Sequence, residues 1–173
     1  TARTHRLGQS LIRADIEPGW NRETASHDRG RKNVYFLSGF DEQETVPSYF
    51  FCEMPNKKAT TIPEAYEILK PEAVKVAEEL GRAIQRQGDI FAIHMNVDKR
   101  ALRKEGATFE KRGKLFNTNH EATEIAQFKD GTLFARGCIS HRPAFRDPDH
   151  KRIKLGNGKA WYLIAKNTVP VAA

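Results

Sequence analysis

Helical periodicity is strongest over residues 71–86. Apolar side chains recur there at intervals of three and four residues, and charged side chains occupy the opposite side. Gly88 follows and suits the left-handed conformation that ends many helices. Thr61 and Pro63 mark the start of a shorter helix upstream, as a cap and an early helical position. The pattern therefore predicts one amphipathic helix over about 71–86 and a shorter one before it.

Alternating apolar and polar positions predict strands on both sides of these helices. Two aromatic runs precede the helices and five runs follow them: 33–40, 48–54, 89–97, 107–116, 120–128, 132–140 and 159–169. The charged residues 98–106 predict a helical turn. The fold class that follows is α+β, with a mostly antiparallel sheet or small β-barrel in the C-terminal half and the amphipathic helix packed on it.

Residues 1–32 lack a sustained hydrophobic pattern. They are polar and rich in arginine, and they end in the basic cluster Arg29-Gly30-Arg31-Lys32. Such a segment cannot bury much surface by itself. We therefore expect an extended N-terminal arm over 1–32, with one short helix at most, that contacts its own domain, another copy of the chain or another partner. Residues 33–173 are expected to form a single α+β domain.

The composition is typical of a soluble globular protein. The 173 residues are 39% hydrophobic, and the longest apolar runs, of about five residues, are far below the roughly 20 that span a bilayer. No secretory leader is visible, although a removed leader is compatible with a chain that begins at Thr1. Cys52 and Cys138 lie far apart and are interpreted as buried free thiols in a reducing compartment. We expect a cytoplasmic protein with no membrane partner.

Positive charge is concentrated in the C-terminal half. The chain has a net charge of +7, but residues 1–96 carry 13 Lys and Arg against 14 Asp and Glu, whereas residues 97–173 carry 16 against 8. A localised basic surface favours a polyanionic partner, most commonly nucleic acid. The alternative is a basic face that only keeps the protein soluble. Nucleic acid is the expected partner, with RNA slightly favoured over DNA.

Asp130-Gly131 lies between two alternating runs and predicts a β-hairpin. If these two residues form the loop, His120 and His141 face each other at the far end, on the apolar face that also holds Ala126. Cross-strand Cβ atoms lie about 4.5–5.5 Å apart, so the two imidazoles can share one metal, phosphate or water. A three-residue loop would instead place His141 opposite Asn119 and His120 on the other face. A purely structural role in the core is the alternative for this pair.

The segment after the hairpin, residues 141–161, is rich in charge and has almost no apolar periodicity. Asp147-Pro148-Asp149-His150 predicts a turn that returns the segment toward the histidine pair. Imidazoles titrate near neutral pH and a carboxylate can orient them, so the predicted catalytic residues are His120, His141, His150 and Asp149. The predicted nucleic-acid-binding residues are Arg142, Arg146, Lys151, Arg152, Lys159 and Lys166. A divalent metal is the one cofactor that the sequence suggests, with His120, His141 and Asp149 as its ligands.

Two more specific motifs do not match. An HNH-type nuclease requires a helix with a final histidine after the Asp149-His150 pair, whereas a strand is predicted there and no histidine follows His150. A cupin-like metal site would add Glu124 to the two histidines. Four residues along a strand span about 13 Å at about 3.3 Å each, which is too far for ligands that each lie about 2 Å from one ion.

The leading hypothesis is a nucleic-acid-binding protein that cleaves or transfers phosphodiesters, either by histidine acid–base chemistry or through a bound metal. One alternative is a structural or assembly protein packed against nucleic acid, with residues 1–32 contacting a neighbour. Another is a metal-dependent small-molecule enzyme built in a β-barrel. The sequence leaves the substrate, the metal and the oligomeric state open.

Overall fold

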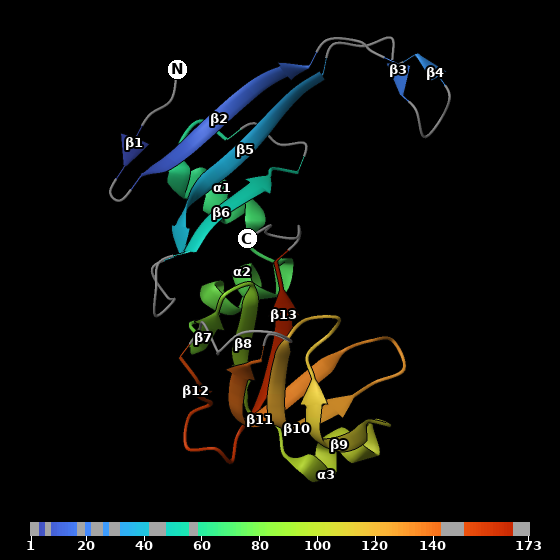
Figure 1. Cartoon of the computed structure of the whole chain (residues 1–173). Coiled ribbons are helices and arrows are strands. Elements are labelled where there is room, and N and C mark those ends of the chain that lie inside the picture. The colour runs from blue at the N-terminus through green and yellow to red at the C-terminus, as the bar shows by residue number, and fades with distance from the viewer. Residues whose placement is uncertain are drawn as a thin grey trace. The chain divides into compact units, whose positions relative to one another are not determined.

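The computed structural model divides into two compact units (Figure 1). The structure describes residues 4–5, 8–16, 20–21, 26–27, 32–41, 48–55, 59–142 and 151–167. Unit 1 comprises Thr1–Phe40, Ser48–Leu69 and Thr168–Ala173. Unit 2 comprises Asp41–Pro47 and Lys70–Asn167. Each unit is built on its own sheet, so we describe them one at a time.

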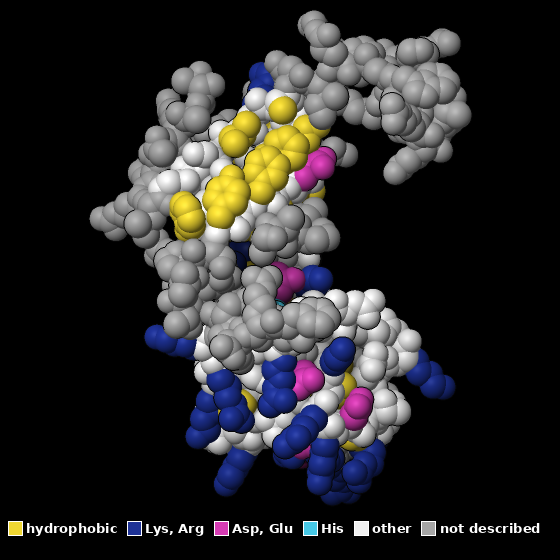
Figure 2. All heavy atoms as spheres, in the orientation of Figure 1, with side chains coloured by type: hydrophobic (Ala, Val, Ile, Leu, Met, Phe, Trp, Pro, Cys, Tyr) yellow, Lys and Arg dark blue, Asp and Glu magenta, His cyan; other side chains and the backbone are white. Residues whose placement is uncertain are grey.

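Unit 1 is a four-stranded sheet with a helix on one face. The strand order is β1 (Thr4–His5), β2 (Gln9–Ile16), β5 (Lys32–Asp41), β6 (Ser48–Glu53), and a separate pair is formed by β3 (Trp20–Asn21) and β4 (Ser26–His27). Helix α1 (Ile62–Leu69) packs its apolar side chains against Leu37 and Cys52. Large hydrophobic side chains are exposed on the other face and form the yellow band in Figure 2.

Unit 2 is a seven-stranded antiparallel sheet with two short helices. The strand order is β7 (Ile84–Gln87), β8 (Ile90–Met95), β13 (Trp161–Lys166), β11 (Leu133–His141), β10 (His120–Gln127), β9 (Thr108–Lys114), and β12 (Ile153–Lys154) pairs with β11. The helices are α2 (Glu72–Glu79) and α3 (Lys99–Lys104). The α+β class with mostly antiparallel sheets is thus confirmed. The described strands are not closed into a barrel.

The core of unit 2 lies on both faces of its sheet. On one face, Val74 of α2 packs near Phe91, and Leu102 of α3 packs near Trp161. The other face holds a larger buried cluster: Ile90, Ala92, Leu115, Ala122, Ile125, Leu133, Ala135, Ile139, Leu155, Tyr162 and Ile164. None of the helices described in either unit is both long and apolar enough to cross a membrane.

Helix α2 ends earlier than its periodicity predicts. Gly81 has a φ of +64°, its N–H donates to the carbonyl of Glu78 at 3.0 Å, and the N–H of Arg82 donates to Ala77 at 2.9 Å. These two hydrogen bonds form the Schellman motif that ends a helix at a left-handed glycine. The predicted helix over 71–86 is therefore correct only in its first half, because the apolar spacing continues past the glycine that ends it.

The predicted hairpin forms with a longer loop than predicted. The N–H of Phe128 donates to the carbonyl of Thr132 at 2.9 Å, which encloses three residues, and Gly131 adopts a φ of +87°. Near this loop Ile125 pairs with Ala135 and Ala126 with Phe134. The predicted pairing of the inner residues is wrong by one position, and Ala126 belongs to the helix-covered face.

A β-bulge in β11 reverses this offset. The register shifts between Ala122 and Glu124 of β10, where two β11 residues, Gly137 and Cys138, lie opposite Thr123. Gly137 has a φ of +93°, as the glycine of such a bulge requires. The N–H of Cys138 donates to the Thr123 hydroxyl at 3.1 Å. Beyond the bulge the predicted register is restored.

The structure places part of the expected N-terminal arm inside a sheet. Strand β2 pairs along β5 from Ser10 to Ile16, and Leu11 packs against the core of unit 1. The compact units also divide residues 33–173 near residue 70. Both observations differ from the expected organisation, which has an arm over 1–32 and a single domain over 33–173.

Deletion of residues 1–32 tests the two descriptions. Because the deletion removes β2 and uncovers Leu37, we expect unit 1 to lose more than about 2 kcal/mol of stability, as for other losses of core packing. Trp20 is removed with the segment, so Trp161 in the core of unit 2 becomes the sole tryptophan. Far-UV circular dichroism should show lost strand signal while tryptophan emission still reports a folded unit 2. Full retention of the dichroism signal would support an arm.

Candidate functional site

His120 and His141 face each other across β10 and β11, as the sequence predicts. Their ring centroids lie 4.6 Å apart and the rings are tilted by 35°. His120 is only 3% exposed, whereas His141 is partly exposed. The two rings therefore differ in access: a substrate in solvent can reach His141, while His120 lies behind it.

Two residues that the sequence analysis did not select surround His120. Its Nδ1 lies 3.2 Å from the Thr118 hydroxyl and 3.9 Å from a carboxylate oxygen of Asp89. The other carboxylate oxygen of Asp89 lies 3.6 Å from Lys166 Nζ. Lys166, Asp89 and His120 thus form a row of charged and polar groups that ends at the His141 ring.

The turn that carries Asp89 could have been predicted from the sequence. Gly88 and Asp89 form the two-residue loop of the β7–β8 hairpin, because Gln87 pairs with Ile90. Gly88, at a φ of +56°, occupies the first loop position, where such hairpins favour glycine. The helical periodicity before Gly88 instead favours a helix end at this glycine, which conceals the loop that carries the carboxylate.

Three of the predicted nucleic-acid-binding residues have their backbones at the His141 end of β11. Arg142 directly follows His141, and its Nε lies 3.6 Å from a carboxylate oxygen of Glu121. Ile153 of β12 pairs with Ile139, and this antiparallel register brings the preceding Lys151 and Arg152 toward the His141 end. All three side chains are exposed, so they can contact an anion next to the histidines.

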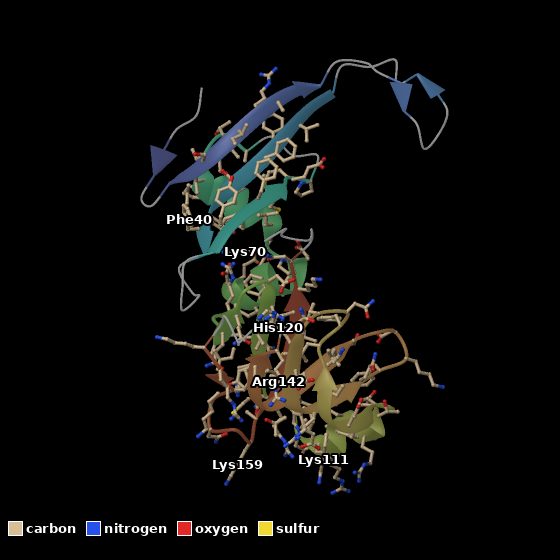
Figure 3. All side chains as sticks on the ribbon, in the orientation of Figure 1. Phe40, Lys70, Lys111, His120, Arg142 and Lys159 are labelled. Atoms are coloured by element: carbon tan, nitrogen blue, oxygen red, sulfur yellow. The ribbon has the colours of Figure 1, made fainter. Side chains whose placement is uncertain are left out.

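The other two described residues of the predicted nucleic-acid-binding set lie at opposite ends of β13. Lys166 is at the end of β13 and contacts Asp89, so it belongs to the histidine site. Lys159 precedes the opposite end of the same strand, and Figure 3 shows it away from His120. Lys159 therefore extends the basic surface but does not join the site.

The remaining predicted site residues are Arg146, Asp149 and His150, which lie outside the described residues. The predicted metal set of two histidines and Asp149 is thus untested. Among the residues that the structure does describe, no group of three or more His, Cys, Asp or Glu side chains is arranged to hold a metal ion. The histidine pair alone supplies two nitrogen ligands.

Glu124 has a different set of partners. Its carboxylate accepts hydrogen bonds from Lys99, at 2.5 Å, and from Arg136. The Arg136 guanidinium in turn lies 5.1 Å from the ring centre of Trp161. Burial raises the pKa of Glu124, but the hydrogen bonds from Lys99 and Arg136 outweigh it and hold the pKa below its usual range. Glu124 therefore stabilises the helix-covered side of the sheet and is not available to the histidines.

An open groove of about 730 Å³ runs beside β9 and β10. It is lined by Glu110, Arg112, Lys114, Phe116, Asn117, Glu121, Ile125, Gln127, Gly131 and Leu133. None of the predicted site residues lines it. Its mixture of acidic and basic side chains gives it no clear preference for an anion, so the histidine pair remains the candidate site.

No family model, curated protein or solved structure matches this chain.

Proposed function

We propose that this protein binds nucleic acid, with RNA favoured, through the basic surface of unit 2, and that it cleaves or transfers phosphodiesters at the His120–His141 pair. The observation that carries the proposal is the opposed histidine pair, backed by Asp89 and adjoined by exposed cations. Over residues 70–142 and 151–167 the chain has 19 Lys and Arg against 10 Asp and Glu. Figure 2 shows many of these cations on the visible face of unit 2.

The geometry supports different roles for the two histidines. In an in-line displacement the attacking and leaving oxygens lie on opposite sides of the phosphorus, and rings 4.6 Å apart are too close to stand on both sides. We therefore assign one proton transfer to His141, which accepts the proton of the attacking hydroxyl. The leaving oxygen takes its proton from solvent water, to which His141 afterwards releases the proton it accepted. His120 is a positioning residue, held between His141 and the Asp89 carboxylate.

The cations supply binding and charge stabilisation. The Arg142 guanidinium can hold two phosphate oxygens in a bidentate manner, and it directly follows His141 in the chain. Lys151 and Arg152 approach the same end of β11. Positive groups fixed beside the reacting phosphate stabilise the charge that develops in the transition state.

Salt dependence of binding tests the nucleic-acid proposal. Affinity for labelled single-stranded and duplex RNA and DNA, measured by fluorescence anisotropy, should fall with salt with a log–log slope of about −0.7 to −0.9 per phosphate contact. Replacing Arg142, Arg146 and Arg152 together by alanine should flatten that slope by roughly two to three units.

A matched variant controls for net charge. Lys75, Lys104 and Lys129 lie on α2, on α3 and in the β10–β11 loop, and replacing all three removes the same charge from elsewhere in unit 2. Its slope should change by less than that of the arginine variant. A slope near zero in the parent protein would contradict nucleic-acid binding altogether.

A structural or assembly role is the second candidate. It is supported by the exposed hydrophobic side chains on the open face of the unit 1 sheet, since contiguous apolar patches commonly mark interaction sites. This role predicts nucleic-acid binding without turnover. The third hypothesis, a metal-dependent enzyme in a barrel, has no support from the described strands, which are not closed into a barrel.

A further inference from the structure

Two strained backbone positions lie in the groove beside β9 and β10. Arg112 and Phe116 have φ values of +55° and +53°, and they are the non-glycine residues with positive φ in the described part of the chain. Both line the groove. A left-handed conformation costs a residue with a side chain about 1–2 kcal/mol. Because strain of this kind is concentrated at binding and catalytic sites, the two positions point to a function for the groove.

Phe116 places an aromatic ring at one end of the groove. It is 38% exposed, whereas the neighbouring Leu115 is fully buried. Residues 116–119 form the β9–β10 loop, which is closed by the Leu115 N–H donating to the carbonyl of His120 at 2.8 Å. The Thr118 hydroxyl donates to the Leu115 carbonyl at 2.7 Å and accepts from the His120 N–H at 3.1 Å. These hydrogen bonds hold the loop that carries the ring.

The same loop joins the groove to the histidine site. The Arg142 N–H donates to the carbonyl of Asn119 at 2.8 Å. The Arg142 Nε lies 3.6 Å from a carboxylate oxygen of Glu121, and Glu121 lines the groove. His120 directly follows the loop and faces His141. A nucleic-acid strand with one phosphate at Arg142 and His141 can therefore continue into the groove.

Two cations of the groove are available to a ligand. Arg112 and Lys114 are exposed, and among the described residues neither side chain forms an ion pair or a hydrogen bond. Of the two acidic residues in the lining, Glu121 is compensated by Arg142, which leaves Glu110 as the opposing charge. The groove thus keeps a net positive charge beside the histidine site and can contact a phosphate.

The other polar side chains suit the edge of a base. Asn117 and Gln127 line the groove, and each amide supplies both donors and an acceptor. Unpaired bases are recognised by such groups along their edges and by aromatic rings on their faces. The volume of about 730 Å³ falls within the roughly 300–1,000 Å³ of small-ligand sites. A mixed lining that has no preference for a simple anion therefore fits a nucleotide.

We propose that this groove binds an unpaired nucleotide of RNA next to the phosphodiester that is cleaved at His141. Phe116 stacks on the base, and Arg112 contacts the phosphate of the same nucleotide. The inference rests on the proposed function and adds a substrate class to it, namely RNA that is single-stranded beside the cleavage position. All the contacts of this nucleotide lie within unit 2.

Binding of the full chain to an unpaired RNA of about 12 nucleotides and to a duplex of the same length tests the proposal. The His141→Gln background removes the proposed proton acceptor and keeps the RNA intact. In this background Phe116→Asn removes the ring and introduces a residue that tolerates a left-handed φ. Affinity for the unpaired strand should fall about 5- to 150-fold, the range for a lost base-stacking side chain. Affinity for the duplex and the melting temperature should be retained.

Leu80→Asn is the matched control for the ring, because Leu80 is an exposed large hydrophobic residue (63%) of unit 2. It should change neither affinity. Equal losses of Phe116→Asn on unpaired and duplex RNA would overturn the proposal, and so would the absence of any loss.

Arg112→Gln tests the phosphate contact. The salt slope for the unpaired strand should flatten by about 0.7, the value for one contact on a single strand, while the duplex slope stays the same. Lys111→Gln is the matched control, since Lys111 is an exposed cation of the same strand that does not line the groove. Equal changes in the two variants would contradict a phosphate contact at Arg112.

Phe116→Trp keeps the test decisive if the asparagine variant unfolds. It retains a ring, so affinity for the unpaired strand should be preserved, and its emission should be quenched by unpaired RNA and not by duplex. Absence of this quenching would overturn the stacking contact.

The outcomes also separate the groove from the proposed function. If unpaired-strand affinity depends on Phe116 but the parent cleaves none of the RNAs, the groove is supported and the cleavage is rejected. If salt-dependent binding and cleavage are both unaffected by Phe116→Asn, the groove is rejected while the proposed function stands.

Discussion

Replacing His141 by glutamine should abolish phosphodiester cleavage without unfolding the protein. His141 is the histidine of the pair that solvent reaches, and removing a general acid–base group typically costs about 10²- to 10⁴-fold in rate. His120→Gln should cause a comparable loss, because the two rings lie within contact distance. The double variant should lose little more than either single one, since residues that act as a unit are not additive. Cleavage of a panel of labelled RNAs measures all three.

Thermal unfolding of the same variants separates a site from a structural role. His120 is buried, and a replacement that leaves buried polar groups unpaired costs about 1–3 kcal/mol. His5→Gln, in unit 1, is the control and should change neither the rate nor the melting temperature. Unstable His120 variants together with a parent that cleaves none of the RNAs would make the pair structural.

Replacing Gly137 by alanine should destabilise unit 2 by about 2–5 kcal/mol. A Cβ there would lie 2.7 Å from the Thr123 Cβ, and overpacking of this kind costs about 1–3 kcal/mol. The φ of +93° adds roughly 1–2 kcal/mol for a residue with a side chain. Thermal unfolding should show a fall in melting temperature of at least about 8 °C, given about 4–8 °C per kcal/mol for a domain of about 100 residues.

Gly131 provides the matched control for this variant. It has a similar φ of +87°, but an added Cβ would have no neighbour within 4 Å. Gly131→Ala should therefore carry the backbone cost alone, about 1–2 kcal/mol. Equal losses at the two glycines would mean that the close approach to Thr123 contributes nothing, and that the bulge is not tightly specified.

The histidine pairing was predictable from sequence, although for a partly wrong reason. The prediction depends on a two-residue loop at Asp130-Gly131 and a regular ladder, whereas the structure has a three-residue loop and a bulge at Gly137. The two differences cancel at His120 and His141. Neither the third loop residue nor the bulge could be predicted from the alternation of apolar and polar residues, because an extra residue in one strand shifts the pairing only beyond that point.

Contacts between distant segments account for most of what the sequence did not reveal. Asp89 reaches His120 only because separate hairpins of one sheet approach each other, and no local pattern encodes that approach. The strand character of residues 9–16 was hidden because their neighbour in the sheet, β5, begins at residue 32. The aromatic runs of β5 and β6 were identified as strands, but which of their faces stays open depends on where α1 packs.

The position of β13 has a consequence for how unit 2 folds during synthesis. The hairpins β7–β8 and β10–β11 are local and can form as soon as each is made, since short loops close quickly. They meet only through β13, which lies between β8 and β11 and is the last strand of the unit to be translated. Until Trp161 and its neighbours leave the ribosome, both hairpins must present unpaired edges and an incomplete core. Nascent chains that stop before residue 161 should therefore depend on chaperones, whereas chains that include β13 should fold cooperatively.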